Sequence, residues 1–248
     1  MSKVVLITGA SRGIGRATAL LAGARGWSVG VNFAGNAEAA RRTVADVQAA
    51  GGKAIAVQGD VAREADVLAM FDATQRTFGR LDGLVNNAGI AAPAQPLVDM
   101  SVERLRRMFE VNVLGAYLCA REAARRLAKN RGGAGGAIVN VGSGASRRGG
   151  GDTYVDYAGS KGAVDTLTIG LAKELGPHGV RVNCVRPGPI DTEIHAVVGD
   201  PQRGRKMGAA TPVGRVGTAE EVAQCIVWLL GDAPAYLTGA MLDVAGGM

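Results

Sequence analysis

The chain contains few of the residues that build metal sites and disulfide frameworks. Its three cysteines, Cys119, Cys184 and Cys225, lie far apart, and its only histidines are His178 and His195. So sparse a set excludes a tetrahedral zinc site, and an odd number of scattered cysteines argues against a disulfide framework. We therefore expect no metal centre and no disulfides.

Long apolar runs are also absent. No stretch approaches the length that crosses a bilayer, and residues 1–3 lead directly into a strand-like segment without a cleavable signal. The expected location is the cytoplasm, with no membrane as a partner.

Aromatic residues are scarce, at 4% of the chain, whereas 47% of the residues are hydrophobic and 38 are glycine. This composition is typical of a globular enzyme rather than of a disordered or coiled-coil chain. A chain of 248 residues can form one large domain or two small ones. No linker is needed to explain its length, so we expect a single domain over residues 1–248.

The formal net charge of +6 could indicate a nucleic-acid partner, because a positive field concentrates anions. The basic residues are spread out, however, and the pairs at 41–42, 106–107 and 125–126 lie in helix-like segments of alternating charge. Such segments are typical of solvated helix faces. We expect no nucleic-acid partner.

Short apolar runs alternate with longer segments of helical periodicity along the chain. The strand-like runs are 4–7, 29–31, 54–57, 84–85, 137–141, 180–185 and 241–244. The helical segments are 15–24, 37–49, 65–78, 102–127, 155–175 and 219–230. Continuously apolar strands are buried on both faces, and helical crossovers make them parallel. The pattern predicts an α/β fold with a doubly wound parallel sheet of about seven strands and helices on both faces.

One long stretch has no clear periodicity. Residues 187–218 carry four of the eight prolines, and such a segment in a compact domain is commonly functional. We predict a mobile substrate lid at about residues 188–217.

The first strand-like run leads into a glycine-rich turn. Residues 8–15 read Thr-Gly-Ala-Ser-Arg-Gly-Ile-Gly, and a helical segment follows. Such a turn lets the backbone approach a pyrophosphate, which the free N–H groups of the helix N-terminus bind. Ordinary turns also use glycine, but the position between a strand and a helix indicates a dinucleotide phosphate site.

The spacing T-G-x-x-x-G-x-G resembles the cofactor motif of the short-chain dehydrogenase/reductase family, and the resemblance covers nearly the whole chain. Four further motifs of that family follow in order: Asn86-Asn87-Ala88-Gly89, the helical Asn112, Ser143 ahead of Tyr157-Ala158-Gly159-Ser160-Lys161, and Pro187-Gly188. The resemblance implies a Rossmann-like fold and a hydride transfer between a nicotinamide dinucleotide and a carbonyl or alcohol carbon.

Tyr157 and Lys161 lie four residues apart in a helical segment, so both side chains leave one face. A fixed ammonium group near a phenol favours the phenolate that a base needs near neutrality. By resemblance, Tyr157 transfers the substrate hydroxyl proton, Ser143 hydrogen-bonds the carbonyl oxygen, Lys161 binds the ribose hydroxyls and Asn112 holds a relay water. Taken alone, such a pair is more often a buried ring and a surface charge; the surrounding motifs argue against that interpretation.

Two serines follow the fifth strand-like run. Ser143 matches the family's strand-end serine, whereas Ser146 lies deeper in a loop beside Arg147 and Arg148. We therefore assign Ser143. It is not a hydrolase nucleophile, because neither histidine stands in a recognisable triad context.

The resemblance also implies the cofactor contacts. Asp60 and the N–H of Val61 would hold the adenine ring, with a helix N-cap as the alternative role of Asp60. Asn86 is expected to be structural. The expected contacts are Gly9, Ser11, Arg12, Gly13, Ile14, Gly15, Asp60, Val61, Asn87, Ala88, Gly89, Tyr157, Lys161, Pro187, Ile190 and Thr192.

The end of the second strand indicates a preference for NADP(H). NAD-selective sites usually place a carboxylate there to hold the ribose hydroxyls, but residues 31–36 contain no acid. Arg12 matches a position from which NADP-preferring relatives reach the 2′-phosphate, and a guanidinium suits phosphate. The alternative is that Arg12 only solvates the loop and that Asn32 or Asn36 holds the ribose of NAD.

The implied function is therefore an NADP(H)-dependent oxidoreductase of a small-molecule ketone or secondary alcohol, with 3-oxoacyl thioesters and sugars among the candidates. His178-Gly179 stands where carrier-protein reductases usually have a basic residue, which weakens the carrier-protein case. The alternative is a catalytically silent dinucleotide-binding sensor or scaffold. Residues 236–247 resemble the family's C-terminal strand and tail, which pack across a two-fold axis, so we expect a homotetramer; a tail that closes its own sheet edge is the other reading.

Overall fold

The computed structural model describes residues 2–151, 153–193 and 202–248. Seven parallel strands form one sheet in the order β3-β2-β1-β4-β5-β6-β7. The strands are β1 Val4–Ile7, β2 Ser28–Phe33, β3 Lys53–Gln58, β4 Gly83–Asn86, β5 Gly136–Val141, β6 Val180–Pro187 and β7 Met241–Val244. β1, β2 and β4 are buried along their whole length, as the continuous apolar runs predict, whereas the edge strands β3 and β7 are partly exposed.

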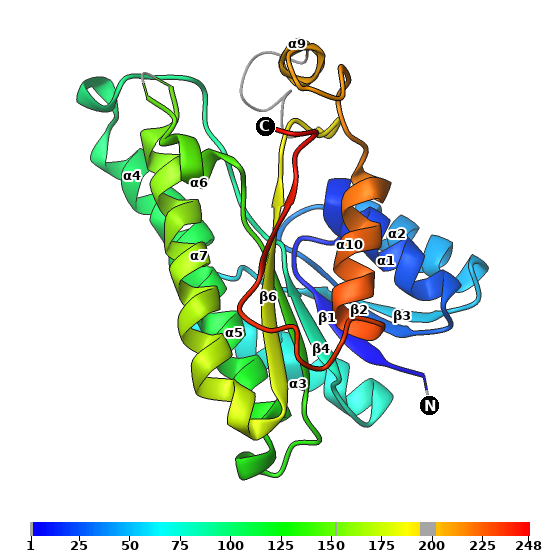
Figure 1. The fold of residues 1–248 in the computed structure, drawn as a ribbon. Coiled ribbons are helices and arrows are strands. Elements are labelled where there is room, and N and C mark those ends of the chain that lie inside the picture. The colour runs from blue at the N-terminus through cyan, green and yellow to red at the C-terminus, as the bar shows by residue number, and fades with distance from the viewer. Residues whose placement is uncertain (1, 152, 194–201) are drawn as a thin grey trace.

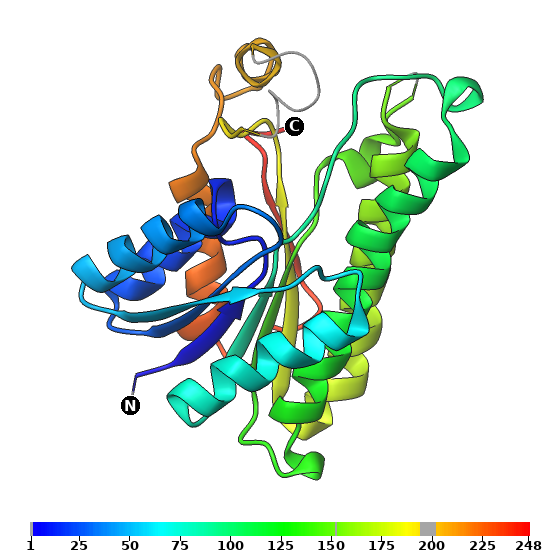
Figure 2. The same cartoon turned by 180° about the vertical axis from the view of Figure 1, so that it is seen from behind.

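Helices cover both faces of the sheet (Figures 1 and 2). One face carries α1 Gly13–Ala24, α2 Ala37–Ala49 and α10 Ala219–Gly231. The other carries α3 Glu64–Phe78, α4 Val102–Phe109, α5 Gly115–Leu127 and α7 Val155–Leu175. Two short helices, α6 Ala145–Arg148 and α9 Arg203–Ala209, lie near the carboxyl ends of the strands. The layout is the doubly wound α/β domain predicted from the sequence.

Each face of the sheet has its own hydrophobic core. Val29 and Val31 of β2 pack with Ile226 of α10 on one face. Leu6 of β1 and Phe71 of α3 belong to the core on the other. The sheet therefore holds the carboxyl ends of its strands in a fixed arrangement, and the candidate site is built there.

One predicted helix is wrong in detail. The segment 102–127 is not a single α-helix, because a π-helical turn, Glu110–Leu114, separates α4 from α5. Gly115 follows that turn in close contact with the chain after β3: a Cβ at Gly115 would lie 2.6 Å from Val61 Cγ2. The extra residue of the π turn carries Asn112 toward the candidate site, which helical periodicity does not reveal. α1 also begins at Gly13, two residues earlier than predicted, because Arg12 is its N-cap.

The predicted lid, 188–217, is described in two parts, and residues 194–201 lie outside the described residues. Its two ends are joined, since Ile190 and Gly217 form an isolated β-bridge. The N–H of Gly217 donates to the carbonyl of Pro189 at 3.0 Å, and the N–H of Asp191 donates to the carbonyl of Gly217 at 2.9 Å. Within the described part of the segment, α9 lies away from the sheet.

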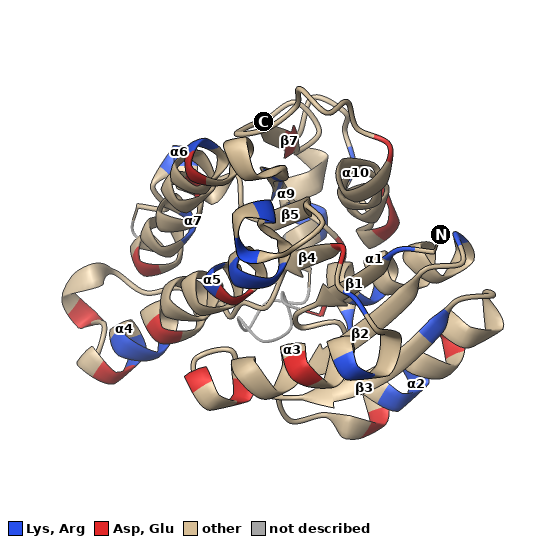
Figure 3. Ribbon diagram, turned by 90° about the horizontal axis from the view of Figure 1, so that it is seen from below, with Lys and Arg blue, Asp and Glu red and all other residues tan. Residues whose placement is uncertain are grey.

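Acidic and basic residues alternate over the helices in Figure 3, as on α2 and α4. Several of the expected solvated pairs are indeed ion pairs, such as Arg42 with Glu38 and Arg126 with Asp72. In the part of the chain that the structure describes, we find no helix that is long and apolar enough to span a membrane.

Candidate active site

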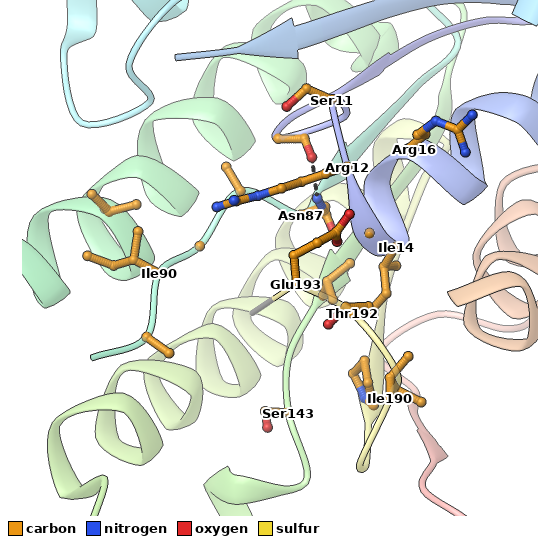
Figure 4. Close-up of a pocket in the computed structure, with 18 of the residues that line it drawn as sticks. Ser11, Arg12, Ile14, Arg16, Asn87, Ile90, Ser143, Ile190, Thr192 and Glu193 are labelled. Carbon is orange, nitrogen blue, oxygen red and sulfur yellow. Dashed lines mark hydrogen bonds between the residues drawn. The ribbon is translucent and has the colours of Figure 1, made fainter. Parts of the chain in front are cut away.

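A cavity of about 1060 Å³ opens at the carboxyl ends of the parallel strands. Its walls include Gly9 after β1, Phe33 of β2, Asn87 after β4, Val141 of β5 and Pro187 of β6. Ligands of doubly wound sheets bind at the carboxyl ends of the strands, at the point where the strand order changes direction. In this sheet that point lies between β1 and β4. In Figure 4, Ser11 lies near one end of the drawn cavity and Ser143 near the other.

Three glycines shape the turn between β1 and α1. Gly9 and Gly13 have positive φ angles of 62° and 52°, which residues other than glycine rarely adopt. A Cβ at Gly15 would lie 2.4 Å from the carbonyl oxygen of Gly9 and 2.6 Å from Asn87 Nδ2. The turn is therefore folded tightly onto the start of α1, so its backbone can approach a phosphate as the sequence predicts.

Polar side chains that directly follow β1 and β4 hold this turn in place. The Thr8 hydroxyl accepts hydrogen bonds from the N–H groups of Asn87 and Ala88, both at 2.9 Å. Asn87 Nδ2 donates to the carbonyls of Thr8 at 2.8 Å and Gly9 at 3.2 Å (Figure 4). Asn87 thus supports the turn through its side chain. Asn86 is structural, as expected, and donates to the carbonyl of Ala116 at 2.8 Å.

The asparagines at the end of β2 have structural partners. Asn32 is buried, accepts from the N–H of Gly9 at 3.1 Å and donates to the carbonyl of Gly59 at 3.0 Å. Asn36 caps α2 by accepting from the N–H of Ala39 at 3.0 Å. Asn32 is therefore engaged through both its oxygen and its nitrogen, and Asn36 through its oxygen.

Arg12 is exposed to solvent and lines the cavity. Its guanidinium makes no ion pair with any described residue, whereas Arg16, one turn along α1, pairs with Asp46 at 2.6 Å. Figure 4 shows the Arg12 side chain extending from the start of α1 across the cavity, toward the segment of Ile90. Arg12 is thus available for an anion.

Asp60 lines the cavity after β3 and is not a helix N-cap, because Arg63 holds that position in α3. Its carboxylate accepts from the N–H of Ala62 and from Arg107 Nη2, both at 3.0 Å. Burial raises the pKa of this carboxyl, but the Ala62 N–H and the Arg107 guanidinium outweigh burial and leave the pKa below its ordinary value. Val61 lies beside it on the cavity wall.

Tyr157 and Lys161 lie on successive turns of α7, and both line the cavity. Lys161 Nζ is 5.8 Å from the centre of the Tyr157 ring and donates to the carbonyl of Val141 at 2.8 Å. Lys161 is buried, so its ammonium is fixed beside the end of β5. This geometry places a positive charge within reach of the phenol, as the four-residue spacing predicts.

Ser143, and not Ser146, faces the cavity. The Ser143 Oγ accepts from the N–H of Ala145 at 3.1 Å, which leaves its proton free to donate to a ligand. Ser146 instead donates to the carbonyl of Ser143 at 2.9 Å and so folds the loop behind it. The structure thus brings Ser143, Tyr157 and Lys161 to one cavity.

Asn112 is buried behind the wall and does not line the cavity. Its Oδ1 accepts from the N–H of Ile90 at 2.8 Å, and its Nδ2 donates to the Ile90 carbonyl at 2.9 Å and to Ser160 Oγ at 3.1 Å. A Cβ at Gly89 would lie 3.3 Å from Asn112 Oδ1 and 3.4 Å from Lys161 Nζ. Asn112 therefore fixes the segment after β4 against α7, next to the lysine.

Of the predicted site residues, only Gly15 and Asn112 do not line the cavity; both pack directly behind its wall. Three of the predicted residues lie at the start of the predicted lid or just before it. Pro187 ends β6, and Ile190 is buried. Thr192 lies against the glycine turn, where its Cγ2 is 3.5 Å from the Cβ position of Gly13.

Several lining residues escaped the sequence analysis. They are Phe33, Ala34, Gly35, Arg42, Arg107, Ile90, Arg148, Thr153, Tyr154, Glu193 and Met207. Arg42 and Arg107 lie on solvated helix faces, as expected, with side chains 66% and 50% exposed, but both also line the cavity. Residues 33–35 lie in the stretch searched for an acid, and Glu193 and Met207 lie in the predicted lid, but none of these residues was predicted individually as a site residue.

Among the described residues, no group of three or more histidine, cysteine, aspartate or glutamate side chains is placed to hold a metal ion. His195 lies outside the described residues, and His178 Nε2 is 3.2 Å from Asn130 Nδ2 at the far end of β6. The hydroxyls of Ser143 and Tyr157, with the Lys161 ammonium beside them, suit proton exchange with a carbonyl or alcohol oxygen. The glycine turn of the same cavity suits a dinucleotide.

Comparisons with known proteins agree with this site. Residues 9–248 match the family described as enoyl-(acyl carrier protein) reductase. The chain is 43% identical over 247 residues to L-rhamnose 1-dehydrogenase (NAD(P)(+)) of Sphingomonas sp., covering 99% of this chain and 96% of that protein.

Two solved structures extend the likeness to three dimensions. The 3-ketoacyl-(acyl-carrier-protein) reductase of Brucella melitensis, complexed with NADH, superposes with a TM-score of 0.90 at 32% identity, over 99% of this chain and 97% of that one. A short chain dehydrogenase of Burkholderia cenocepacia, in complex with NADP, superposes with a TM-score of 0.89 at 35% identity, over 99% of this chain and 97% of that one. The chain therefore belongs to the classical short-chain dehydrogenase/reductase family and is an NAD(P)-dependent oxidoreductase that acts on CH–OH groups and the corresponding carbonyls.

Proposed function

We propose that this protein uses NADP(H) to interconvert a small-molecule ketone and the corresponding secondary alcohol. The observation that carries the proposal is the convergence of Ser143, Tyr157 and Lys161 on the cavity that also contains the glycine turn. The dinucleotide, when bound, supplies or accepts the hydride. The protein's own residues bind it, orient the substrate and move the proton.

Tyr157 is assigned as the group that gives a proton to the developing alkoxide, or takes it from the alcohol. Lys161, fixed by the Val141 carbonyl, stabilises the phenolate electrostatically and binds the ribose hydroxyls. Ser143 donates its hydroxyl proton to the substrate oxygen, because its Oγ already accepts from Ala145. Asn112 is proposed to support the proton relay from behind the wall, where it fixes Ile90 against α7.

A preference for NADP(H) over NAD(H) is supported by three features at the glycine turn and β2. No acid follows β2 over residues 31–36, Arg12 has no ion-pair partner among the described residues, and both asparagines near the expected ribose are occupied by backbone groups. The site therefore offers a guanidinium to a 2′-phosphate and no carboxylate to a 2′-hydroxyl. Titration of NADPH and NADH into the protein, followed by nucleotide fluorescence, tests the preference; equal dissociation constants would reject it.

Sugars and 3-oxoacyl thioesters are the first substrates to test, since relatives of this chain are named for each class. The experiment is a panel of ketones and secondary alcohols with the intact protein, monitored by NADPH absorbance in both directions. Turnover of at least one member supports the proposal. No turnover across a broad panel, despite tight cofactor binding, would instead favour a catalytically silent dinucleotide-binding sensor.

A further inference from the structure

A second arginine, at the opposite end of the cavity from the glycine turn, has no place in the function proposed above. Arg148 ends the short helix α6 and lines the same cavity as Ser143 and Tyr157. Its Nη1 and Nη2 atoms lie 3.4 and 3.7 Å from the point where a Cβ of Gly144 would be. Gly144 follows Ser143 directly, so the guanidinium lies over the backbone of the residue next to the expected hydrogen-bond donor to the substrate.

Arg148 differs from neighbouring arginines in having no acidic partner among the described residues. Arg147, the preceding residue, pairs with Asp243 at 2.7 Å, and Arg186 pairs with Asp165 at 2.9 Å. Arg148 contacts only the Met248 thioether, at 4.0 Å, which is a weak acceptor. Its charge is therefore not neutralised by the part of the chain that the structure describes.

The cavity that Arg148 lines also carries hydroxyl and apolar groups, from Thr153, Tyr154 and Met207. Three acidic side chains are described on the cavity wall, and none of them contacts Arg148. Asp46 pairs with Arg16, and Asp60 pairs with Arg107. Glu193 lies at the glycine turn, where its Oε2 is 3.7 Å from the Cβ position of Gly13. An anion bound near Ser143 would thus meet one guanidinium and no competing carboxylate from a described residue.

We propose that Arg148 binds an anionic oxygen group of the substrate, a carboxylate or a phosphate, while the carbonyl of the same molecule lies at Ser143 and Tyr157. The inference rests on the proposed function and narrows its substrate class to anionic ketones and hydroxy compounds. It follows because a planar guanidinium binds carboxylate and phosphate through paired hydrogen bonds, and because Arg148 lies at the substrate end rather than at the cofactor turn. Arg12 then binds the 2′-phosphate of the cofactor, and Arg148 binds the anionic group of the substrate.

Matched pairs of substrates test the inference. Each pair has the same carbon skeleton with and without the charge: an oxo acid against its neutral amide, and dihydroxyacetone phosphate against dihydroxyacetone. The first pair reports on carboxylate and the second on phosphate. We expect the intact enzyme to prefer the charged member of one pair in kcat/KM.

Replacement of Arg148 by Gln should lower kcat/KM for that charged substrate about 10- to 100-fold, the loss expected for one hydrogen-bonded charged contact. The neutral member and the dissociation constant for NADPH should remain unchanged, and Arg148→Lys should recover part of the loss. Arg147→Gln is the matched control, because Arg147 pairs with Asp243 and does not line the cavity.

The outcomes separate this inference from the proposed function. If the intact enzyme reduces the neutral ketones as well as the charged ones, or if Arg148→Gln lowers both members of a pair equally, anion recognition by Arg148 is rejected while the oxidoreductase assignment stands. If no member of either pair, and no member of the broad panel, is turned over, the proposed function itself is rejected. A loss restricted to the charged substrate in Arg148→Gln, absent in Arg147→Gln, supports the inference.

Discussion

Tyr157 is the residue on which the proposed proton transfer depends. Replacement by Phe removes the hydroxyl and leaves the ring, so NADPH binding should be retained. Turnover should fall about 10²- to 10⁴-fold, the usual contribution of a positioned acid or base. Steady-state kinetics on the best substrate of the panel, together with an NADPH fluorescence titration, measures both quantities.

Tyr117→Phe is the matched control for that change, because Tyr117 is an exposed residue of α5 outside the cavity. Its turnover should equal that of the unmodified protein. A Tyr157→Phe variant with the same turnover as Tyr117→Phe would refute the assignment of Tyr157.

Arg12 is the residue proposed to distinguish the two dinucleotides. Arg12→Ala should weaken NADPH binding about 10-fold or more, since a charged hydrogen bond to phosphate is lost, and should leave NADH binding nearly unchanged. Isothermal titration with both nucleotides measures the effect. Equal weakening of both would show that Arg12 supports the turn rather than the phosphate.

The cysteines should be unreactive in the folded protein. Burial raises the pKa of Cys119 to about 12. Burial, with the Asp165 carboxylate nearby, raises the pKa of Cys184 to about 12, and burial also raises the pKa of Cys225. Raised pKa values keep the thiols protonated near pH 8, where the thiolate is the reactive form.

Ellman's reagent at pH 8 should therefore react much more slowly with the native protein than with the same protein in urea, where all three thiols become available. Reaction of Cys119 or Cys184 at the unfolded rate, identified by mass spectrometry of the labelled protein, would contradict the burial argument.

At the scale of elements, a buried ion pair joins α4 to the start of α7. Arg104 Nε donates to Asp156 Oδ2 at 2.8 Å, and the Asp156 side chain is completely buried. The same guanidinium donates to the Pro93 carbonyl at 2.7 Å and to Gln95 Oε1 at 3.0 Å. Asp156 precedes Tyr157 and accepts its N–H at 2.8 Å, so this pair fixes the backbone beside the proposed proton donor.

Removal of one partner leaves the other charge buried. Arg104→Met should therefore lower the free energy of unfolding by about 3–5 kcal/mol, measured by urea denaturation. Arg25→Met, which breaks the exposed pair with Asp232, is the control and should cost less than about 1 kcal/mol. Similar losses in the two variants would mean that the Arg104–Asp156 pair contributes no more than a surface pair.

The lid remains a prediction at this scale. Its ends are fixed by the backbone pairing of Ile190 with Gly217, so any opening involves the residues between them. We propose that this segment, which includes α9 and Met207, covers the substrate after binding.

For the whole molecule, we propose a homotetramer. Three apolar side chains from the end of α4, the π turn and α5 support an interface, since Phe109, Leu114 and Tyr117 are each more than two-fifths exposed. Multi-angle light scattering should give a mass near four times that of the 25.3-kDa chain. Leu114→Arg should shift the mass to a smaller species, because a charge on this face would have to be desolvated. A monomeric mass for the unmodified protein at micromolar concentration would exclude the tetramer.

Much of this architecture could be predicted from the sequence because it depends on local pattern. Continuous apolar runs fix the parallel strands, helical periodicity fixes α2 and α7 to the residue, and the spacing of Tyr157 and Lys161 places them on one helix face. The glycine turn could be predicted for the same reason, since the positive φ angles of Gly9 and Gly13 are ones that glycine adopts readily.

The remainder depends on contacts between residues far apart in the chain, which no local pattern encodes. The π turn that carries Asn112 lies where Gly115 packs on Val61 and Asn112 binds Ile90. Asn32 accepts from the N–H of Gly9 in the glycine turn, because the sheet brings β2 beside β1. Sequence determined the fold and the chemical groups; only the tertiary structure decided which of them face the cavity, because burial and charge pairing are settled when distant elements pack together.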